Sequence, residues 1–249
     1  MSPPRPLWPY PRVIAHRGAG ALAPENTLAA LRLGRNRGFR GVEFDVRLSG
    51  DGVPVLMHDE TLERTTDGRG RVADTAYEVL QRLDAGGWFG NEFLGEPVPA
   101  LAAAIALCQQ SGLWANIELK PCPGREVEIG RAVARVVQLA GAGPQPHLLS
   151  SFSIEALEAA KQEAPRLPRG LLVEAPPGDW KARLDQLECV SLHADWRHLD
   201  RERVRQIHSA GFAVLAYTVN DSEAALQLLG WGVDALVTDQ LDAIGPDFA

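Results

Sequence analysis

The chain has 249 residues, of which 45% are apolar and 23% are charged, and its net charge is −7. These proportions are typical of soluble globular proteins and exclude a disordered chain, which lacks the apolar surface that offsets the entropy of ordering. The negative charge argues against a nucleic-acid partner, because it gives no general attraction to phosphate backbones. The longest apolar run, around Pro99–Cys108, is about half of the roughly 20 residues that a membrane-spanning helix needs. We therefore expect no membrane insertion.

The three cysteines, Cys108, Cys122 and Cys189, form no C-x-x-C pair, and their number is odd. This pattern argues against a disulfide framework or a zinc ribbon and favours ordinary buried thiols in a reducing compartment. The first residues, MSPPRPLWPYPR, lack the apolar stretch of a secretory signal. We therefore expect a cytoplasmic protein, and the sequence does not indicate its oligomeric state.

Short β-rich runs alternate with helical patterns from the N-terminus to the C-terminus. The expected strands are Val13–Ala15, Val42–Val46, Ala115–Leu119, Leu148–Ser151, Gly170–Val173, Val190–His193, Val214–Val219 and Ala235–Thr238. The expected helices are Thr27–Arg37, Leu101–Ser111, Glu126–Leu139, Ser153–Glu163, Trp180–Gln186, Arg201–Ser209 and Ser222–Leu229. Eight such steps in about 250 residues predict a closed (β/α)8 TIM barrel. An open, doubly wound sheet is the alternative, although no G-x-G-x-x-G follows the first strand.

One apolar run, Val53–Met57, is left over after the turn Ser49-Gly50-Asp51-Gly52. Four turn residues cannot hold a crossover helix, so this run is expected to fold back as a β-hairpin. Pairing of Leu48 with Val53 sets His58 opposite Glu43, and a slip of one or two residues sets it opposite Phe44 or Asp45. We interpret residues 1–249 as a single barrel domain and residues 47–99 as a hairpin and small cap inserted after the second strand.

Glu43, Asp45 and Arg47 alternate with apolar residues along the second strand. In a barrel covered by helices the apolar face meets the helices, so both carboxylates point into the barrel mouth. Two acids so close repel each other, and a bound cation removes that penalty. A solvated acidic face on an edge strand is the alternative.

On the next parallel strand, Asn116, Glu118 and Lys120 share one face by the same period. Glu118 is a third carboxylate for the cation, and Lys120 adds a positive charge above it. Oxygen ligands favour a hard ion, Mg²⁺ or Ca²⁺, over zinc. A structural Glu118–Lys120 ion pair is the alternative.

The first strand runs directly into His16 and Arg17, residue types suited to proton transfer and anion binding. A surface loop is the alternative for this pair. Of the other histidines, His193 ends an expected strand and is a weaker candidate for the mouth. His147 is expected at the opposite end of the barrel, and His198 and His208 are expected on the surface.

Six segments together resemble the glycerophosphodiester phosphodiesterase family. They run in order from Val13 to Asp239 and read VIAHRGAGALAPENTLAAL, GVEFDVRLSGDGVPVLMHDETLERTTDGRG, NIELKP, LLSSF, AYTVN and WGVDALVTD. The likeness is greatest to the short cytoplasmic bacterial enzymes. It implies metal-dependent hydrolysis of glycerophosphodiesters to sn-glycerol 3-phosphate and an alcohol.

Carried over residue by residue, the resemblance implies that Glu43, Asp45 and Glu118 hold one divalent cation, Mg²⁺ or Ca²⁺. His16 and His58 correspond to the general acid and base. Arg17 and Lys120 correspond to phosphate contacts, and Tyr217 occupies a substrate-binding position where relatives often carry Trp. A second departure is Pro99–Ala102, which lacks the polar helix start of many relatives.

Several points stay open at the level of sequence. Attack on phosphorus comes either from the glycerol 2-hydroxyl through a cyclic phosphate or directly from water. We expect the glycerol moiety in the barrel mouth and the alcohol toward the insertion, against Trp88 and Phe89. A metal-dependent barrel enzyme acting on an enolisable acid, and a barrel that has lost catalysis, are the rival interpretations.

Overall fold

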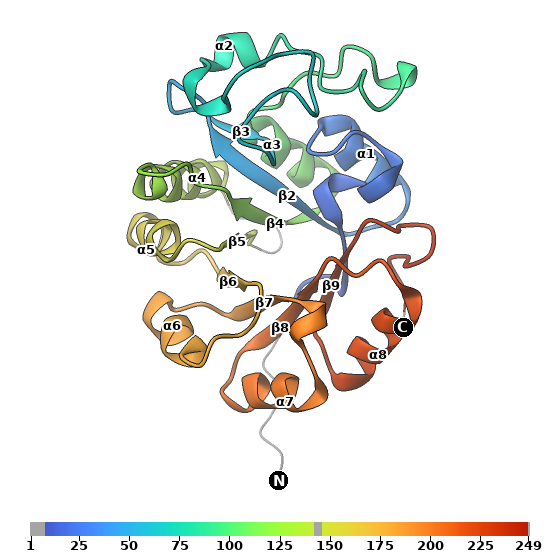
Figure 1. The fold of residues 1–249 in the computed structure, drawn as a ribbon, viewed down its shortest axis with the longest axis vertical. Coiled ribbons are helices and arrows are strands. Elements are labelled where there is room, and N and C mark those ends of the chain that lie inside the picture. Colours follow the sequence, from blue (N-terminus) through green and yellow to red (C-terminus); the bar gives the residue numbers. More distant parts are fainter. Residues whose placement is uncertain (1–7, 142–145, 249) are drawn as a thin grey trace.

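A computed structural model describes residues 8–141 and 146–248, with strands and helices alternating as expected (Figure 1). The strands are β1 (Val13–Ala15), β2 (Gly41–Leu48), β3 (Pro54–Leu56), β4 (Trp114–Leu119), β5 (Leu148–Ser151), β6 (Arg169–Val173), β7 (Ser191–Asp195), β8 (Ala213–Tyr217) and β9 (Ala235–Thr238). The α-helices are α1 (Leu28–Asn36), α2 (Tyr77–Leu80), α3 (Leu101–Ser111), α4 (Glu126–Ala140), α5 (Ile154–Glu163), α6 (Trp180–Leu187), α7 (Arg201–Ser209) and α8 (Ser222–Trp231). Short 3-10 turns are η1 (His16–Gly18), η2 (Gly20–Leu22), η3 (Val72–Asp74), η4 (Asn91–Phe93) and η5 (Trp196–His198).

Eight parallel strands close into a barrel in this part of the chain. β2 pairs with β4, and each later strand pairs with the next as far as β9, which pairs with β1. The closing contact between β1 and β2 aligns Ile14 with Gly41 and Ala15 with Val42. It removes the two free edges that an open sheet would keep. The predicted (β/α)8 barrel is therefore confirmed, and the doubly wound sheet is excluded.

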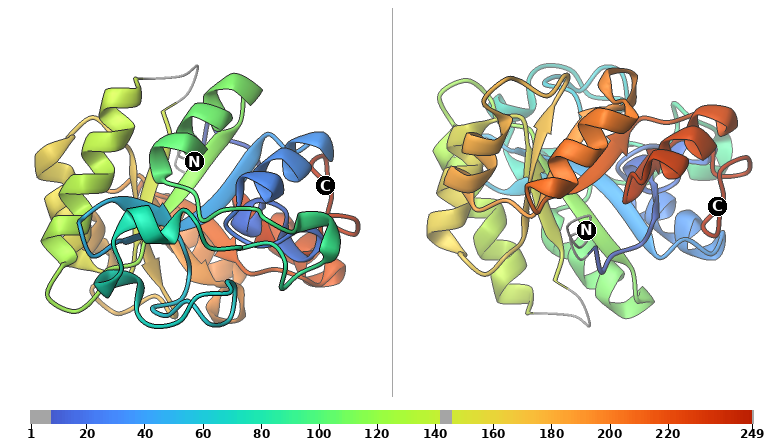
Figure 2. Two further views of the ribbon diagram at one scale, coloured as in Figure 1. Left: turned by 90° about the horizontal axis from the view of Figure 1, so that it is seen from above. Right: turned by 90° about the horizontal axis from the view of Figure 1, so that it is seen from below.

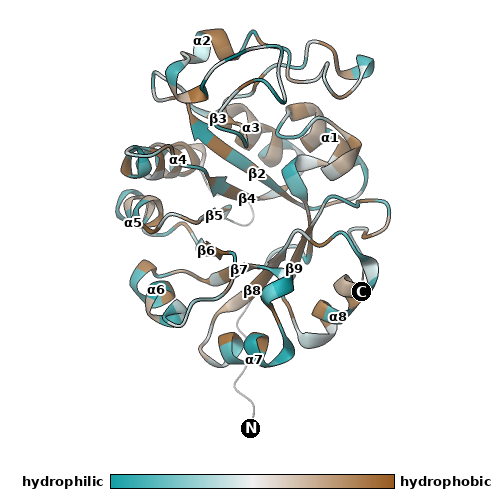
Figure 3. Cartoon of the chain, in the orientation of Figure 1, coloured by the Kyte–Doolittle hydropathy of each residue, from teal (hydrophilic) through white to brown (hydrophobic). Residues whose placement is uncertain are grey.

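Two sets of apolar side chains pack on the two faces of the barrel wall. Outward residues of β2, including Val42, Phe44 and Val46, are fully buried against the helices. Inward residues near the N-terminal ends of the strands form a second cluster, which Tyr10 closes by stacking on Trp114 at 4.5 Å between ring centroids. In Figure 3, β8 and β9 are largely hydrophobic, whereas hydrophilic and hydrophobic residues alternate along β2. The lower interior thus contains this apolar cluster, whereas the acidic residues of β2 and β4 lie toward the C-terminal end.

β3 runs antiparallel to β2 and forms the predicted hairpin. Leu48 pairs with Pro54 rather than with Val53, a slip of one residue from the first register considered. The same register, continued beyond β3, sets His58 opposite Phe44. His58 therefore returns to the level of the acidic residues of β2, as the hairpin argument predicted.

Residues 57–99 form the insertion between β3 and α3. They bury a small apolar cluster of their own, which includes Leu62 and Val72. The insertion lies on the flank of the barrel, beyond β2 and β3 (Figures 1 and 2). The proposed division, one domain over residues 1–249 with the hairpin and cap at 47–99, stays a prediction.

Two polar residues, Asn26 and Thr27, precede α1 and make different contacts. Thr27 caps the helix, because its hydroxyl accepts a hydrogen bond from the Ala30 N–H at 3.1 Å. Asn26 instead has a φ of +59° and turns its side chain toward β2. α3 begins after Ala100 without a side-chain cap among the described residues, in line with its apolar start.

Two expectations from composition concern the cysteines and the helices. All three cysteines are buried and free of disulfides, as expected. Within residues 8–141 and 146–248, no helix has both the length and the hydropathy of a membrane span.

Candidate active site

Three carboxylates meet at the C-terminal end of the barrel. Glu43 and Asp45 point inward from β2, and Glu118 points inward from β4, where it is the register neighbour of Asp45. One oxygen of each carboxylate lies within 4.8 Å of an oxygen of the other two. The period-two pattern of the two strands thus brings together the three acids that the sequence singled out.

Burial makes the negative charges of these acids costly. Burial, and then the charge of Asp45, raises the pKa of both Glu43 and Glu118. For Asp45 burial acts in the same direction, but Lys120 and Arg17 outweigh it and the pKa is lowered. The Oε1 atom of Glu43 is buried and accepts no hydrogen bond from the described residues. An unpartnered oxygen among three carboxylates fits a hard, oxygen-binding divalent cation.

Two cationic side chains face the acids. The Nζ atom of Lys120 lies 2.6 Å from Glu118 Oε1 and 3.2 Å from Asp45 Oδ1. The Nε atom of Arg17 lies 3.4 Å from Asp45 Oδ2. Burial alone would lower the pKa of Lys120, but the acids outweigh it and the pKa is raised. The Glu118–Lys120 ion pair considered from the sequence is present, and Asp45 shares the same lysine.

The turn after β1 sets Arg17 in place. Arg17 has a φ of +50°, which is uncommon for a residue other than glycine. Its backbone N–H donates to Glu43 Oε2 at 3.0 Å. Gly18 follows with a φ of +98°, and a Cβ there would lie 2.9 Å from the Cβ of Ala30. The His-Arg-Gly turn therefore packs onto α1 only because its third residue has no side chain.

Each of the two candidate histidines has a carboxylate at its Nδ1 atom. His16 Nδ1 lies 2.6 Å from Oδ1 of Asp239, and His58 Nδ1 lies 2.7 Å from Oδ1 of Asp59. An ionised carboxylate only accepts hydrogen bonds, so each Nδ1 donates and each Nε2 is left to exchange protons. His16 Nε2 lies 3.8 Å from Glu43 Oε2, at the edge of the acidic cluster.

The pKa values of these two histidines shift in opposite directions. Burial alone would lower the pKa of His16, but the hydrogen bond to Asp239 and the charge of Glu43 outweigh it, and the pKa is raised. For His58 burial dominates, and the pKa is lowered although Asp45 and Asp59 oppose the change. The two rings thus have different proton affinities.

Sequence reasoning did not single out Asp59 or Asp239, nor a role in the mouth for Asn26. Asn26 donates to Asp45 Oδ2 and accepts from the Asp45 N–H, both at 2.9 Å. Two signals were available: Asp59 directly follows His58, and Asp239 directly follows the last strand. In a barrel, residues at that end of a strand line the active face.

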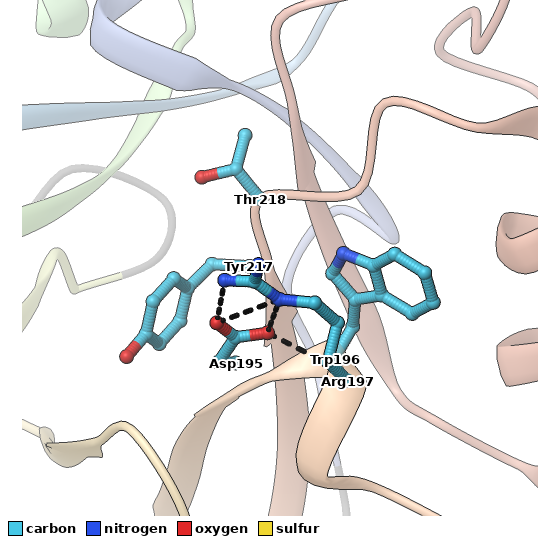
Figure 4. Close-up of a pocket in the computed structure, with 5 residues that line it drawn as sticks. All are labelled: Asp195, Trp196, Arg197, Tyr217 and Thr218. Carbon is cyan, nitrogen blue, oxygen red and sulfur yellow. Dashed lines mark hydrogen bonds and ion pairs between the residues drawn. The ribbon is translucent and has the colours of Figure 1, made fainter.

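Tyr217 ends β8, elsewhere on the barrel wall. Its hydroxyl donates to the carbonyl of Val173 at 2.8 Å, and its ring packs edge-to-face on Phe152. Lys120 Nζ lies 6.0 Å from the centre of the Phe152 ring, so these contacts link Tyr217 to the acidic cluster. Tyr217 also lines a pocket of about 320 Å³ (Figure 4). The other lining residues are Asp195, Trp196, Arg197 and Thr218.

Known proteins match this chain over almost all of its length. The model of the glycerophosphoryl diester phosphodiesterase family matches residues 16–243. A glycerophosphodiester phosphodiesterase of Caldanaerobacter subterraneus subsp. tengcongensis is 34% identical, covering 93% of this chain and 95% of that protein. A glycerophosphodiester phosphodiesterase of Bacillus subtilis is 32% identical, and the match covers 97% of this chain and 86% of that protein. The structure of an Oleispira antarctica phosphodiesterase, in complex with the product sn-glycerol-3-phosphate, is 44% identical with a TM-score of 0.91, covering 94% of this chain and 97% of that one.

Proposed function

Because the chain belongs to the glycerophosphoryl diester phosphodiesterase family, and is therefore a phosphoric diester hydrolase, we propose that it converts glycerophosphodiesters to sn-glycerol 3-phosphate and an alcohol. The observation that carries this proposal is the meeting of three acids and two carboxylate-bound histidines at one end of the barrel. The product complex of the Oleispira antarctica relative supports the choice of product. A cytoplasmic location, inferred from the three cysteines without a disulfide pattern, is part of the proposal.

We assign one divalent cation, Mg²⁺ or Ca²⁺, to Glu43, Asp45 and Glu118. The unpartnered Glu43 oxygen and the raised pKa values of both glutamates support this assignment. When bound, such a cation stabilises negative charge on a phosphate oxygen and lowers the pKa of a hydroxyl in its coordination shell.

Arg17 and Lys120 hold the phosphate. Both side chains lie beside Asp45, so a phosphate at the acids meets two fixed positive charges. Positive groups that are already in place stabilise the charge that develops during hydrolysis without reorganising.

His16 and His58 move the protons of the reaction. One ring accepts the proton of the attacking hydroxyl, and the other donates a proton to the leaving oxygen. Asp239 and Asp59 each accept a hydrogen bond from Nδ1 and so hold the ring in the tautomer in which Nε2 exchanges the proton. The attacking oxygen belongs either to the glycerol 2-hydroxyl, in which case a cyclic phosphate forms first, or to water. A diester that lacks the 2-hydroxyl separates the two routes, because only direct attack by water hydrolyses it.

The two alcohols of the substrate meet surfaces of different chemistry. The pocket beside Tyr217 carries the polar side chains of Asp195, Arg197 and Thr218, which suit the hydroxyls of glycerol. On the insertion, Trp88 is 43% exposed and its ring packs on that of Phe89. We therefore assign glycerol to the Tyr217 pocket and the variable alcohol to the insertion, whose apolar wall distinguishes head groups only weakly.

The test is a substrate panel measured at one Mg²⁺ or Ca²⁺ concentration, with glycerol 3-phosphate detected by an NADH-linked assay. We expect choline, ethanolamine, serine and glycerol diesters to differ in kcat/KM by no more than about two decades. Bis(p-nitrophenyl) phosphate, followed by its colour, should be a poor substrate. A preference for this aromatic diester over every glycerol diester would contradict the proposed substrate class.

A further inference from the structure

Arg64 of the insertion makes four charged hydrogen bonds to two carboxylates. Its Nε and Nη2 atoms donate to Oδ2 and Oδ1 of Asp59 at 2.6 and 2.9 Å. Its Nη1 and Nη2 atoms donate to Oε2 and Oε1 of Glu25 at 2.7 and 2.8 Å. The planar guanidinium thus binds one carboxylate on each of two edges, and the two acids are brought side by side at Nη2.

Both carboxylates also hold a residue of the proposed site. Asp59 Oδ1 accepts from His58 Nδ1 at 2.7 Å, and Glu25 Oε1 accepts from Arg17 Nη1 at 2.7 Å. We propose that Arg64 is a positioning residue that fixes His58 and Arg17 relative to each other. Through it, the histidine that exchanges protons and the arginine that binds phosphate share one rigid ion network. This inference rests on the proposed roles of His58 and Arg17.

Only an arginine can make this arrangement. A guanidinium offers five donors in a fixed plane, whereas a lysine ammonium is a point charge with rotatable donors. A lysine in place of Arg64 can neutralise Asp59 and Glu25 in part but cannot hold both in one plane. Without any cation there, the two carboxylates repel each other, and Asp59 is free to turn away from the His58 ring.

The insertion holds the backbone of Arg64 from both sides. Leu62, 1% exposed, belongs to the apolar cluster of the insertion, and Thr65 and Thr66 are also buried. Thr66 bonds back to the Leu62 carbonyl through its backbone N–H at 3.0 Å and its hydroxyl at 2.7 Å. The small core of the insertion therefore determines where the Arg64 guanidinium lies, and the insertion orients catalytic groups as well as providing a wall.

Steady-state kinetics of Arg64→Met and Arg64→Lys with glycerophosphocholine test this role. We expect kcat to fall by about 10–100-fold in both variants, the usual effect of removing a group that orients a ligand or catalytic side chain. KM should rise several-fold through Arg17. The matched control is Arg82→Met, which removes an ion pair of the insertion with Glu78 that is 73% exposed on both sides. Its kcat should stay within twofold of wild type. Wild-type kcat in Arg64→Lys would overturn the proposal, and this variant carries the test alone if Arg64→Met does not fold.

A double-mutant comparison separates positioning from general destabilisation. In a His58→Ala background, Arg64→Met should lower kcat by less than about threefold, because the ring that it positions is gone. An undiminished loss of kcat in that background would overturn the role of Arg64 toward His58.

Titration of the His58 ring by NMR needs no turnover. The charged groups that face this ring are Asp45, Asp59, Arg17 and Lys120. The hydrogen bond to Asp59 raises the pKa of His58. When Asp59 turns away from the ring, the pKa of His58 should therefore fall in Arg64→Met and stay unchanged in Arg82→Met. An unchanged titration in Arg64→Met would overturn the proposal. If the wild type releases no glycerol 3-phosphate but this pKa falls in Arg64→Met, the proposed function fails and the ion network stands.

Discussion

The histidines at the mouth of the barrel and those packed inside it differ in what they contact. His16 and His58 each bond a carboxylate through Nδ1. His193 is fully buried on β7, and its Nε2 lies 2.8 Å from the hydroxyl of Ser191. His147 is 4% exposed near the start of β5, and its Nδ1 accepts from a backbone N–H at 3.1 Å. Two of the four rings therefore have acidic partners, and two have neutral ones.

This difference decides which rings can exchange protons near neutral pH. Burial lowers the pKa of His193 to about 3 and that of His147 to about 4. No charged group in the described part of the chain offsets that burial. At His16 the acids reverse the effect of burial. Among these four rings, an acidic partner thus distinguishes the two candidate proton carriers at the mouth from the two buried neutral rings.

The suggestion that His193 approaches the mouth is wrong. Its ring covers Gly170 of β6, where a Cβ would lie 2.3 Å from His193 Nε2, and it bonds Ser191 toward the N-terminal end of β7. The expectation that His208 lies on the surface is also wrong, since its side chain is 12% exposed and lies 2.8 Å from Asp234. Gly170 of the neighbouring strand β6 lies against the His193 ring, and Asp234, which directly precedes β9, lies against the His208 ring.

The largest effect should come from removing the rings themselves. His16→Ala and His58→Ala should each lower kcat by about 10²–10⁴-fold, because each removes a proton carrier. His193→Gln, the matched change inside the barrel, should keep kcat within about threefold of wild type. Steady-state rates with glycerophosphocholine, together with melting temperatures, test the comparison. Wild-type turnover in His16→Ala or His58→Ala would remove that ring from the mechanism.

Removing the acidic partners of the two histidines should have the next largest effect on kcat. Asp59→Asn and Asp239→Asn should lower kcat by about 10–10³-fold, because an amide can donate to Nδ1 and favour the wrong tautomer. Asp234→Asn, which removes the carboxylate beside His208, is the control and should leave kcat unchanged. Equal kcat values in all three variants would mean that the carboxylates at the mouth do not orient their histidines.

The buried neutral histidine should appear in the pH dependence of stability. Its folded pKa of about 3 lies below the ordinary value of 6.5. Between these values the unfolded chain binds more protons, so the free energy of unfolding falls as the pH is lowered from 6.5. The loss is at most about 1.4 kcal/mol per pH unit. Urea unfolding at pH 6.5 and 4.5 should show a smaller loss of stability in His193→Gln, by up to about 2–3 kcal/mol. The same slope in both proteins would contradict this account of His193.

Tyr217 should give the smallest effect. Its hydroxyl is committed to the carbonyl of Val173, so Tyr217→Phe removes one hydrogen bond worth about 0.5–1.5 kcal/mol of stability. The ring remains, and kcat/KM should change less than about threefold. Tyr217→Ala, which also removes the wall against Phe152, should raise KM for all glycerol diesters alike. A large loss in Tyr217→Phe would mean that the hydroxyl contacts substrate.

The strands and the three acids followed from local pattern. Alternation along β2 and β4 needs only neighbouring residues to set which side chains point inward, and that placed Glu43, Asp45 and Glu118 together. The hairpin pairs one residue away from the first register considered from the sequence, because its register depends on the geometry of the turn rather than on the strand pattern.

Local sequence pattern could not predict which residues contact the acids and histidines of the site. His16 and Asp239 are 223 residues apart in sequence and meet only because β9 pairs with β1. Glu25 and Arg64 are 39 residues apart and belong to two loops whose paths no periodicity determines. The position of the His193 ring likewise depends on Gly170 of the adjacent strand β6.

The most direct test of the central claim is metal add-back to the wild-type protein and to Glu43→Gln. Release of glycerol 3-phosphate from glycerophosphocholine is followed after chelation and then during titration with Mg²⁺ or Ca²⁺, with calorimetry reporting binding of the ion. The wild type should lose turnover with the chelator and regain it with the metal, and Glu43→Gln should bind the ion at least about tenfold more weakly. Turnover that survives the chelator, or equal metal affinity in the two proteins, would contradict a metal-dependent phosphodiesterase built on these three acids.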